Sequence, residues 1–235
     1  MSERITRRGS LVRLGALIAG ATTAGEAFGA TGPSAVASGV VSCVLTPELT
    51  EGPYYIADEK VRRNITEGKP GTPLLLHLGV LDVSSCKPIK GALVDIWHCD
   101  AGGIYSGFVA ASTGGAPGGG GPTDKRTFMR GIQPTAANGI ATFQTIYPGW
   151  YRGRTVHIHV KVHLGGNVVH TGQLFFTDSL TDAVYKAKPY STRPNRDTRN
   201  ADDAIFRNGG SKSMLALHKA ATGYTAAISM GVHRT

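Results

Sequence analysis

The sequence predicts a mostly β, single-domain fold, either a sandwich or a barrel, with long loops and little helix. Short apolar stretches recur at close spacing with turn-forming residues between them, which is the pattern of an all-β domain. Glycine occurs 32 times in 235 residues, often in turn-like settings, and this abundance disfavours long helices. The length is sufficient for one β-rich domain with a hydrophobic core.

Residues 1–38 are expected to form a twin-arginine-type signal peptide, which leaves residues 39–235 as the folded domain. Arg7 and Arg8 precede a mild apolar run, and small-residue sites suited to cleavage follow it. A membrane anchor is the alternative. Glycines interrupt the apolar run, however, and leave it too short to span a bilayer, so we expect no stable membrane insertion. The chain is therefore expected in the periplasm or outside the cell.

The first half of the domain is expected to contain two strands after an irregular start. Turn residues are frequent in residues 38–73, which are expected to be loop. Residues 74–83 alternate with period two, and residues 92–97 combine apolar, β-branched and aromatic side chains, so both are expected to be strands. Residues 113–123 are nearly all Gly, Pro or Thr and are expected to be a flexible loop.

The second half is expected to contain two hairpins, a short helix and a final strand. Asn138-Gly139 and Gly165-Gly166-Asn167 are turn sequences, and the apolar stretches on either side of each turn are expected to pair. The expected ranges are 128–133 and 140–146 for the first hairpin, 156–164 and 168–176 for the second, 178–186 for the helix, 189–212 for a polar loop and 224–232 for the last strand.

Three cysteines, Cys43, Cys86 and Cys99, predict one disulfide and one free thiol in an exported chain. Cys86 and Cys99 flank the strand expected at 92–97 and so lie near its opposite ends. This favours Cys43 as the partner of one of them, and the sequence does not choose which.

The formal net charge is +9. Because no cluster of Lys and Arg is interleaved with aromatic residues, the sequence disfavours a nucleic-acid partner. A basic surface attracts small anions instead, and small aromatic anions are a suitable class.

His157 and His159 are the strongest candidate metal ligands. Residues two apart on a strand point to the same side, so these imidazoles can converge on one ion. Tyr151 and Arg154 come shortly before them and add an anionic oxygen ligand and a fixed positive charge. Alone, a His-x-His pair is more often part of a polar sheet surface. The other histidines are expected to be exposed residues away from the metal: His77, His98, His163, His170, His218 and His233.

Four segments between residues 46 and 178 carry a family resemblance. In chain order they are Glu51-Gly52-Pro53-Tyr54-Tyr55, Trp97-His98-Cys99-Asp100-Ala101-Gly102-Gly103-Ile104-Tyr105-Ser106-Gly107, Thr145-Ile146-Tyr147-Pro148-Gly149-Trp150-Tyr151 with Arg154 and His157-Ile158-His159, and Thr171-Gly172-Gln173-Leu174-Phe175-Phe176. Together they resemble the intradiol ring-cleavage dioxygenases. The resemblance implies a single-domain β-sandwich, which narrows the choice between sandwich and barrel.

The resemblance also implies roles for single residues. The implied iron ligands are Tyr105, Tyr151, His157 and His159. Tyr151 would be displaced by the substrate and accept its proton, and Arg154 would stabilise negative charge on the substrate ring. The implied substrate-binding residues are Pro53, Tyr54 and Gln173.

The implied ligand set favours ferric iron, with one non-haem Fe(III) ion per chain. Tyrosinate is a hard anion, and two phenolates with one hydroxide balance the three charges of Fe(III), so the buried site would be neutral. Zinc and copper sites are the alternative, but they favour His and Cys ligands.

The implied activity is that of an oxidoreductase that incorporates both atoms of O2 into a catechol-type aromatic and opens its ring to a cis,cis-muconate-type diacid. The small diol and O2 are its expected partners. An exported, non-catalytic β-sandwich binding module of the same ancestry is the alternative, although such a module does not need four ligands and Arg154. The spacing from Tyr151 to His157 is shorter than in the better-known catechol and protocatechuate enzymes. The resemblance is therefore to a short, exported branch, and substrate identity and oligomeric state are not carried over.

Overall fold

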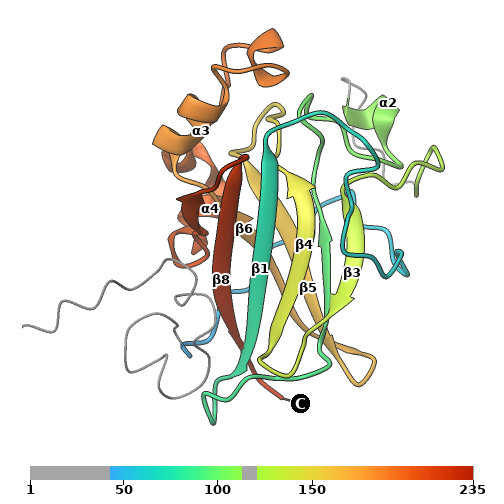
Figure 1. Ribbon diagram of the computed structural model, residues 1–235, viewed down its shortest axis with the longest axis vertical. Helices are drawn as coiled ribbons and strands as arrows, with labels where there is room; N and C mark the ends of the chain where they lie inside the picture. The colour runs from blue at the N-terminus through green and yellow to red at the C-terminus, as the bar shows by residue number, and fades with distance from the viewer. Residues whose placement is uncertain (1–42, 113–120, 235) are drawn as a thin grey trace, which may run out of the picture.

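A computed structural model describes residues 43–112 and 121–234 of the chain. It contains two four-stranded sheets that pack face to face, which confirms the predicted β-sandwich (Figure 1). In spatial order, the β1 sheet consists of β4 (Ile140–Ile146), β1 (Pro73–Asp82), β8 (Tyr224–Val232) and β7 (Ala216–Lys219). The β5 sheet consists of β3 (Arg130–Pro134), β2 (Leu93–Trp97), β5 (His157–Leu164) and β6 (Asn167–Phe175). The expected signal peptide and most of the Gly-rich loop lie outside the described residues.

The core lies between the two sheets and follows the period-two pattern of the strands. Leu76 and Leu78 of β1 are fully buried, and they belong to the same apolar cluster as Ile158, Val160 and Val162 of β5. Burial of such side chains stabilises the fold by about 1.5–3 kcal/mol each. The alternation in β1 therefore orients one face of that strand toward β5.

The other face of the β5 sheet is also covered, by the irregular segment 49–62. Leu49 N–H donates to Thr171 O of β6, and Arg62 N–H donates to Ile132 O of β3, so the segment crosses the whole sheet. Consequently the first six residues of β5 are all buried, although every second one points away from the core. Polar residues on that covered face are enclosed, and the candidate site lies there.

Helix is limited to short pieces outside the sheets. α2 (Val109–Ser112) and α3 (Asp178–Val184) lie on opposite sides of one end of the sandwich (Figure 1). α3 begins at the predicted residue, and the Thr177 side chain caps it by accepting from Leu180 N–H. The predicted loop 189–212 instead contains α4 and short turns of 3-10 helix: Tyr190–Thr192, Asn200–Asp202, α4 (Ala204–Arg207) and Gly210–Lys212. Strand β7 was not predicted.

The hairpin expected around Asn138-Gly139 is wrong, because β3 pairs with β2 and β4 pairs with β1, so the turn carries the chain from one sheet to the other. The second expected hairpin is confirmed by the pairing of β5 with β6.

Cys43 and Cys86 form a disulfide, and Cys99 is a buried free thiol. This resolves the pairing that the sequence left open. Within the described ranges, no helix has the length and apolar character needed to cross a membrane.

The expectation of exposed histidines is wrong for His98 and His170, which are 0% and 2% exposed. His98 is enclosed because its ring nitrogens are satisfied internally, Nε2 by Thr145 Oγ1 at 2.7 Å and Nδ1 by Cys99 O at 2.8 Å. Burial lowers the pKa of His98 to about 4, so the ring is neutral.

Candidate metal centre

The site is built on one row of residues that crosses the β5 sheet. Strand register places Arg130 opposite Trp97, Trp97 opposite His159, and His159 opposite Gln173. Facing residues in a sheet share a side, so all four point to the face covered by segment 49–62. His157 lies two residues before His159 and points the same way.

The two histidines meet through their Nε2 atoms, which are 3.0 Å apart. His157 Nδ1 lies 2.6 Å from Thr155 O, so Nδ1 carries the proton and Nε2 keeps its lone pair. Burial, and then the charge of Arg154, lower the pKa of His157 to about 3; burial and the neighbouring His157 hold the pKa of His159 well below its usual range. Both rings are therefore neutral, as metal ligation requires.

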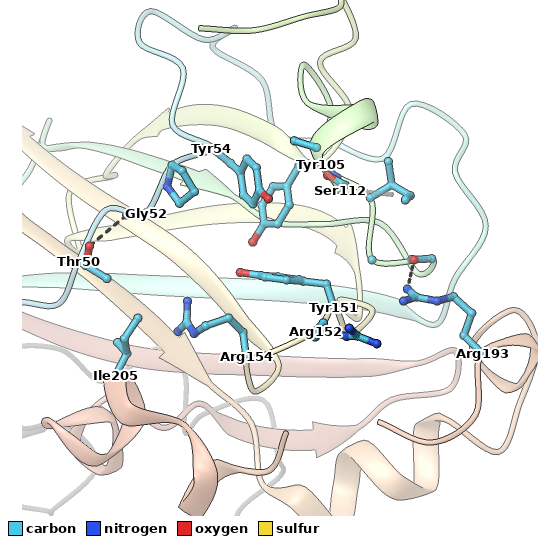
Figure 2. Close-up of a pocket in the computed structure, with 16 residues that line it drawn as sticks. Thr50, Gly52, Tyr54, Tyr105, Ser112, Tyr151, Arg152, Arg154, Arg193 and Ile205 are labelled. Atoms are coloured by element: carbon cyan, nitrogen blue, oxygen red, sulfur yellow. Dashed lines mark hydrogen bonds between the residues drawn. The ribbon is translucent and has the colours of Figure 1, made fainter. Parts of the chain in front are cut away.

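Two tyrosines bring their hydroxyls to the same place. Figure 2 shows the oxygens of Tyr105 and Tyr151 converging across the pocket. Tyr151 Oη lies 3.2 Å from His157 Nε2, and the rings of Tyr105 and His159 are 6.1 Å apart. The pKa of each phenol is raised, chiefly by burial, and for Tyr105 also by the nearby Tyr151. Without a cation, both are therefore protonated.

The donor set fits a hard trivalent cation. Tyr105 is 1% exposed, and apart from the Tyr151 hydroxyl its Oη has no polar partner among the described residues, so its lone pairs are available to a cation. Within the described ranges, no three His, Cys, Asp or Glu side chains gather as a metal site. Two phenol oxygens and two imidazole nitrogens are thus the donors that converge here, and a set with hard oxygen donors differs from the His and Cys sets of zinc and copper sites.

Arg154 is fixed by two hydrogen bonds to residues outside the pocket, and its guanidinium faces the histidines. Its Nε donates to Asp203 Oδ2 at 2.9 Å, and its Nη2 donates to Gln173 Oε1 at 2.5 Å. Its Nη1 lies 3.4 Å from His157 Nε2. Figure 2 shows the guanidinium beside Tyr151 in the pocket. Two fixed acceptors therefore place one positive charge next to the histidines.

The three predicted substrate-binding residues occupy two different places. Pro53 and Tyr54 line the pocket, and the Tyr54 ring stacks on the ring of Tyr105 at 4.5 Å. Gln173 is fully buried and lies behind Arg154; its Nε2 donates to Thr50 O at 2.8 Å. Gln173 therefore does not line the pocket itself; it contacts Arg154, which does.

The pocket has a volume of about 1060 Å³ and opens beside both tyrosines. Besides Arg154 it is lined by Arg152 and Arg193, and its apolar lining includes Ile104 and Ile205 (Figure 2). Such a concave site with apolar walls and a few fixed polar groups suits a small organic ligand. The three arginines favour an electron-rich or anionic one.

The two loops that carry the tyrosines are joined to each other. Gly149 N–H donates to Asp100 O at 3.0 Å. Arg193 Nη1 donates to Gly102 O and to Trp150 O, and Trp150 Nε1 donates to Arg193 O at 2.9 Å. These contacts fix the loop of Tyr105 against the loop of Tyr151.

Comparisons with known proteins show the family of the chain. The model of the Dioxygenase family matches residues 50–196. An intradiol ring-cleavage dioxygenase from Tetranychus urticae is 39% identical, and the alignment covers 81% of this chain and 95% of that one with a TM-score of 0.76.

The chain belongs to the intradiol ring-cleavage dioxygenases.

The dioxygenase domain of a carbohydrate-binding fusion protein from Streptomyces sp. SirexAA-E is 32% identical over 79% of this chain and 96% of that one, with a TM-score of 0.58. Catechol 1,2-dioxygenase 1 of Acinetobacter lwoffii is 31% identical over 113 residues, which are 45% of this chain and 32% of that protein. The chain thus spans about a third of the length of this curated relative. The intradiol dioxygenase family consists of oxidoreductases that depend on non-haem iron.

Three residues of the segment 189–212 that contribute to the site were not expected from the sequence of this family member. Asp203 positions Arg154, and Arg193 and Ile205 line the pocket. All three lie in residues 189–212, which were interpreted as a polar loop. The N-capping pattern of Asp203 before Ala204-Ile205-Phe206 was a usable signal for a short helix, but its contact with Arg154 depends on the tertiary fold.

Proposed function

We propose that the chain is a non-haem Fe(III)-dependent intradiol dioxygenase that cleaves the ring of a catechol-type aromatic to a cis,cis-muconate-type diacid. The observation that carries this proposal is the convergence of Tyr105, Tyr151, His157 and His159 next to the fixed charge of Arg154. Membership of the intradiol dioxygenases supports the reaction type. Both atoms of O2 enter the product as one carbon–carbon bond of the diol breaks.

The two tyrosines and two histidines would hold the iron. When bound, Fe(III) supplies a Lewis acid that takes up the diol oxygens and makes the ring reactive toward O2. The histidines suit permanent ligation because both are neutral and enclosed, and because Thr155 O fixes the His157 ring.

Tyr151 is suited to act as a base. Unlike Tyr105, it is only partly buried, and its ring lines the pocket. Its phenolate oxygen can therefore turn toward an entering diol and accept a hydroxyl proton from it. Tyr105, packed under Tyr54, would keep its position.

Arg154 is suited to stabilise the charge that develops on the diol ring. Asp203 and Gln173 hold its guanidinium before substrate arrives, so no reorganisation is needed during the reaction. Tyr54 and Pro53 form an adjacent wall of the pocket and exclude water from the reacting ring.

The proposal is tested by reconstituting the purified chain with Fe(III) and recording its visible spectrum. Tyrosinate-to-iron charge transfer is expected to colour the protein, and adding catechol is expected to shift the band. Oxygen uptake with a panel of diols should show equimolar consumption of O2 and diol. A protein that stays colourless and binds no Fe(III) would instead fit a non-catalytic binding module.

Tyr151→Phe is expected to weaken the charge-transfer band and to slow turnover by about 100-fold, because one ligand and one proton acceptor are lost. The fold should remain intact. Tyr147→Phe is the matched control, because Tyr147 is buried and hydrogen-bonded to Thr181 at 2.7 Å in the core. The ligand assignment is wrong if the two variants have the same spectrum.

We also propose that the chain is exported through its twin-arginine sequence at residues 7–8. The Cys43–Cys86 disulfide supports this, since disulfides persist in oxidising compartments. Cell fractionation of the wild type and of the Arg7→Lys/Arg8→Lys variant tests it: the variant should remain in the cytoplasm, and equal export of both would contradict the proposal.

A further inference from the structure

Arg130 is a buried charge that the proposed chemistry leaves unexplained. It is 1% exposed and lies on β3, on the covered face of the β5 sheet. Its Nη2 donates to Ser106 O at 2.7 Å, and its Nε donates to Ser106 Oγ at 2.9 Å. The guanidinium therefore donates hydrogen bonds to both the backbone and the side chain of Ser106, the residue that follows Tyr105.

This contact matters because the Tyr105 side chain has no polar anchor besides the Tyr151 hydroxyl. Its hydroxyl lies beside that of Tyr151 and has no other polar partner among the described residues, and its ring packs against Tyr54.

Tyr105 N–H donates to Ser112 Oγ at 3.0 Å, and Arg130 donates to Ser106 O. The N–H groups of Ile104 and Gly107 donate to Asp100 Oδ1 and Asp124 Oδ1, so Arg130 is the cationic member of a set of contacts around this loop. Ser106 in turn donates to Phe128 O at 2.6 Å.

Arg130 also connects this loop to the histidine strand. Arg130 is paired with Trp97 on the neighbouring strand β2. The Trp97 ring stacks on the His159 ring, with ring centroids 4.8 Å apart and an angle of 7° between the ring planes. One row of paired residues across the sheet therefore includes both Arg130, which contacts the Tyr105 loop, and His159. The relative position of a tyrosine and a histidine from distant segments is set by this row.

Burying the charged side chain of Arg130 destabilises the fold, so its presence needs an explanation. The nearest carboxylate is Glu59 at 3.8 Å, and Arg130 Nη1 has no hydrogen-bond partner in the structure. A buried charge with incomplete pairing destabilises a fold by several kcal/mol relative to an apolar residue. What arginine supplies in return is a rigid planar fork that can donate to two acceptors of one residue.

We propose that Arg130 is a positioning residue for the metal centre, and that its fork on Ser106 fixes Tyr105 in place as a ligand. This inference rests on the proposed ferric site. It concerns the placement of the Tyr105 oxygen and assigns Arg130 no contact with substrate.

The test uses the Tyr151→Phe protein as its parent, because the remaining charge-transfer band then comes from Tyr105 alone. Arg130→Lys is added, since lysine keeps the charge but lacks the fork. We expect the band to shift or weaken. Ferric affinity, measured by competition with a chelator, should fall about tenfold, as it does when residues that orient metal ligands are lost.

Ser106→Ala in the same parent removes only the hydroxyl contacts and keeps the buried guanidinium, so it provides a milder second variant. It should change the band in the same direction as Arg130→Lys. Arg196→Lys is the control: Arg196 also donates from two nitrogens, but to the carboxylates of Asp178 and Asp182 in α3. This control is expected to lose thermal stability and to leave the band and ferric affinity unchanged.

The outcomes separate the two proposals. If the Tyr151→Phe parent binds Fe(III) with a charge-transfer band and neither Arg130→Lys nor Ser106→Ala alters band or affinity, Arg130 has no positioning role. If neither the wild type nor the parent binds Fe(III), the ferric site itself fails and the inference fails with it. Should Arg130→Lys not fold, the Ser106→Ala result decides.

Discussion

Asp203 shows how one carboxylate can serve both a helix and a binding site. Its Oδ1 accepts from the N–H groups of Ile205 and Phe206 and so caps α4, while its Oδ2 accepts from Arg154 and Thr155 N–H. Burial opposes its ionisation, but the Phe206 N–H, the Arg154 charge and the Thr155 N–H outweigh burial and lower the pKa of Asp203 below 3.8. Asp203 is therefore ionised in the folded protein at neutral pH.

This depressed pKa predicts a pH dependence of stability. A carboxylate with a folded pKa below its unfolded value stabilises the fold above the unfolded pKa, and that stabilisation is lost as pH falls through the folded pKa. Asp203→Asn is expected to lower the free energy of unfolding by about 2 kcal/mol at pH 7. The difference from wild type should shrink below about pH 3.8.

Urea unfolding of both proteins at pH 7, 5 and 3 measures this difference. The subtraction removes contributions from the other carboxylates. A difference that stays constant from pH 5 to pH 3 would show that Asp203 is not the titrating group.

At the scale of elements, the close approach of two loops decides where the tyrosines lie. Gly103 has φ +81°, and a Cβ there would meet Trp150 O at 2.2 Å. A Cβ on Gly149 would meet Asp100 O and Ala101 O at 2.5 Å. Neither position has room for a side chain, because the backbones of both loops are in direct contact.

Gly103→Ala is therefore expected to destabilise the protein by about 2 kcal/mol or more, from a left-handed conformation and a backbone clash together. Gly153→Ala is the matched control: Gly153 has the same φ of +81°, but a Cβ there would meet nothing within 4 Å. It should cost about 1 kcal/mol. Thermal unfolding compares them, and equal losses would contradict the role of the close approach.

The same elements show how far the sequence could predict the fold and the site. β8 was predicted with its observed bounds, and β1 within one residue at each end, because both bury apolar residues of the core. β7 has four residues and little burial, so it carries almost no pattern. Local spacing predicted that His157 and His159 share a face.

The buried polar residues were harder to predict. Lys161 and Asp95 are enclosed on the outer face of the β5 sheet because segment 49–62 covers them, with Glu51 paired to Lys161. No local pattern signals a cover that is supplied by a distant loop. For the same reason the contact of Asp203 with Arg154 and the contact of Arg130 with Ser106 could not be predicted from sequence.

At the scale of the whole molecule, the Cys43–Cys86 disulfide closes a loop that contains all of β1. It ties the start of the described chain to the turn after that strand, and Thr46 N–H donates to Gly231 O of β8. The residues that precede segment 49–62, which covers the candidate site, are thus attached to the β1 sheet by the disulfide and by this hydrogen bond.

Removing this link with Cys43→Ser/Cys86→Ser is expected to lower the free energy of unfolding by about 2–4 kcal/mol, since a cross-link restricts the unfolded chain. Denaturant unfolding with and without a reductant measures the effect. Reductant should destabilise the wild type and leave the double variant unchanged. A thiol reagent should label Cys99 only after unfolding, because that thiol is buried.

The position of β8 has a consequence for the order in which the molecule can be made. β8 lies inside the β1 sheet, between β1 and β7, and it pairs in parallel with β1 from Leu74 opposite Tyr224 onward. During synthesis the edge of β1 stays open until the last strand has emerged, and pairing across so long a stretch of chain is slow. The sheet that packs against the sheet of the histidine strand is therefore completed only after residues 224–232 have been made. A cation that needs the finished site can be held only after β8 has paired with β1.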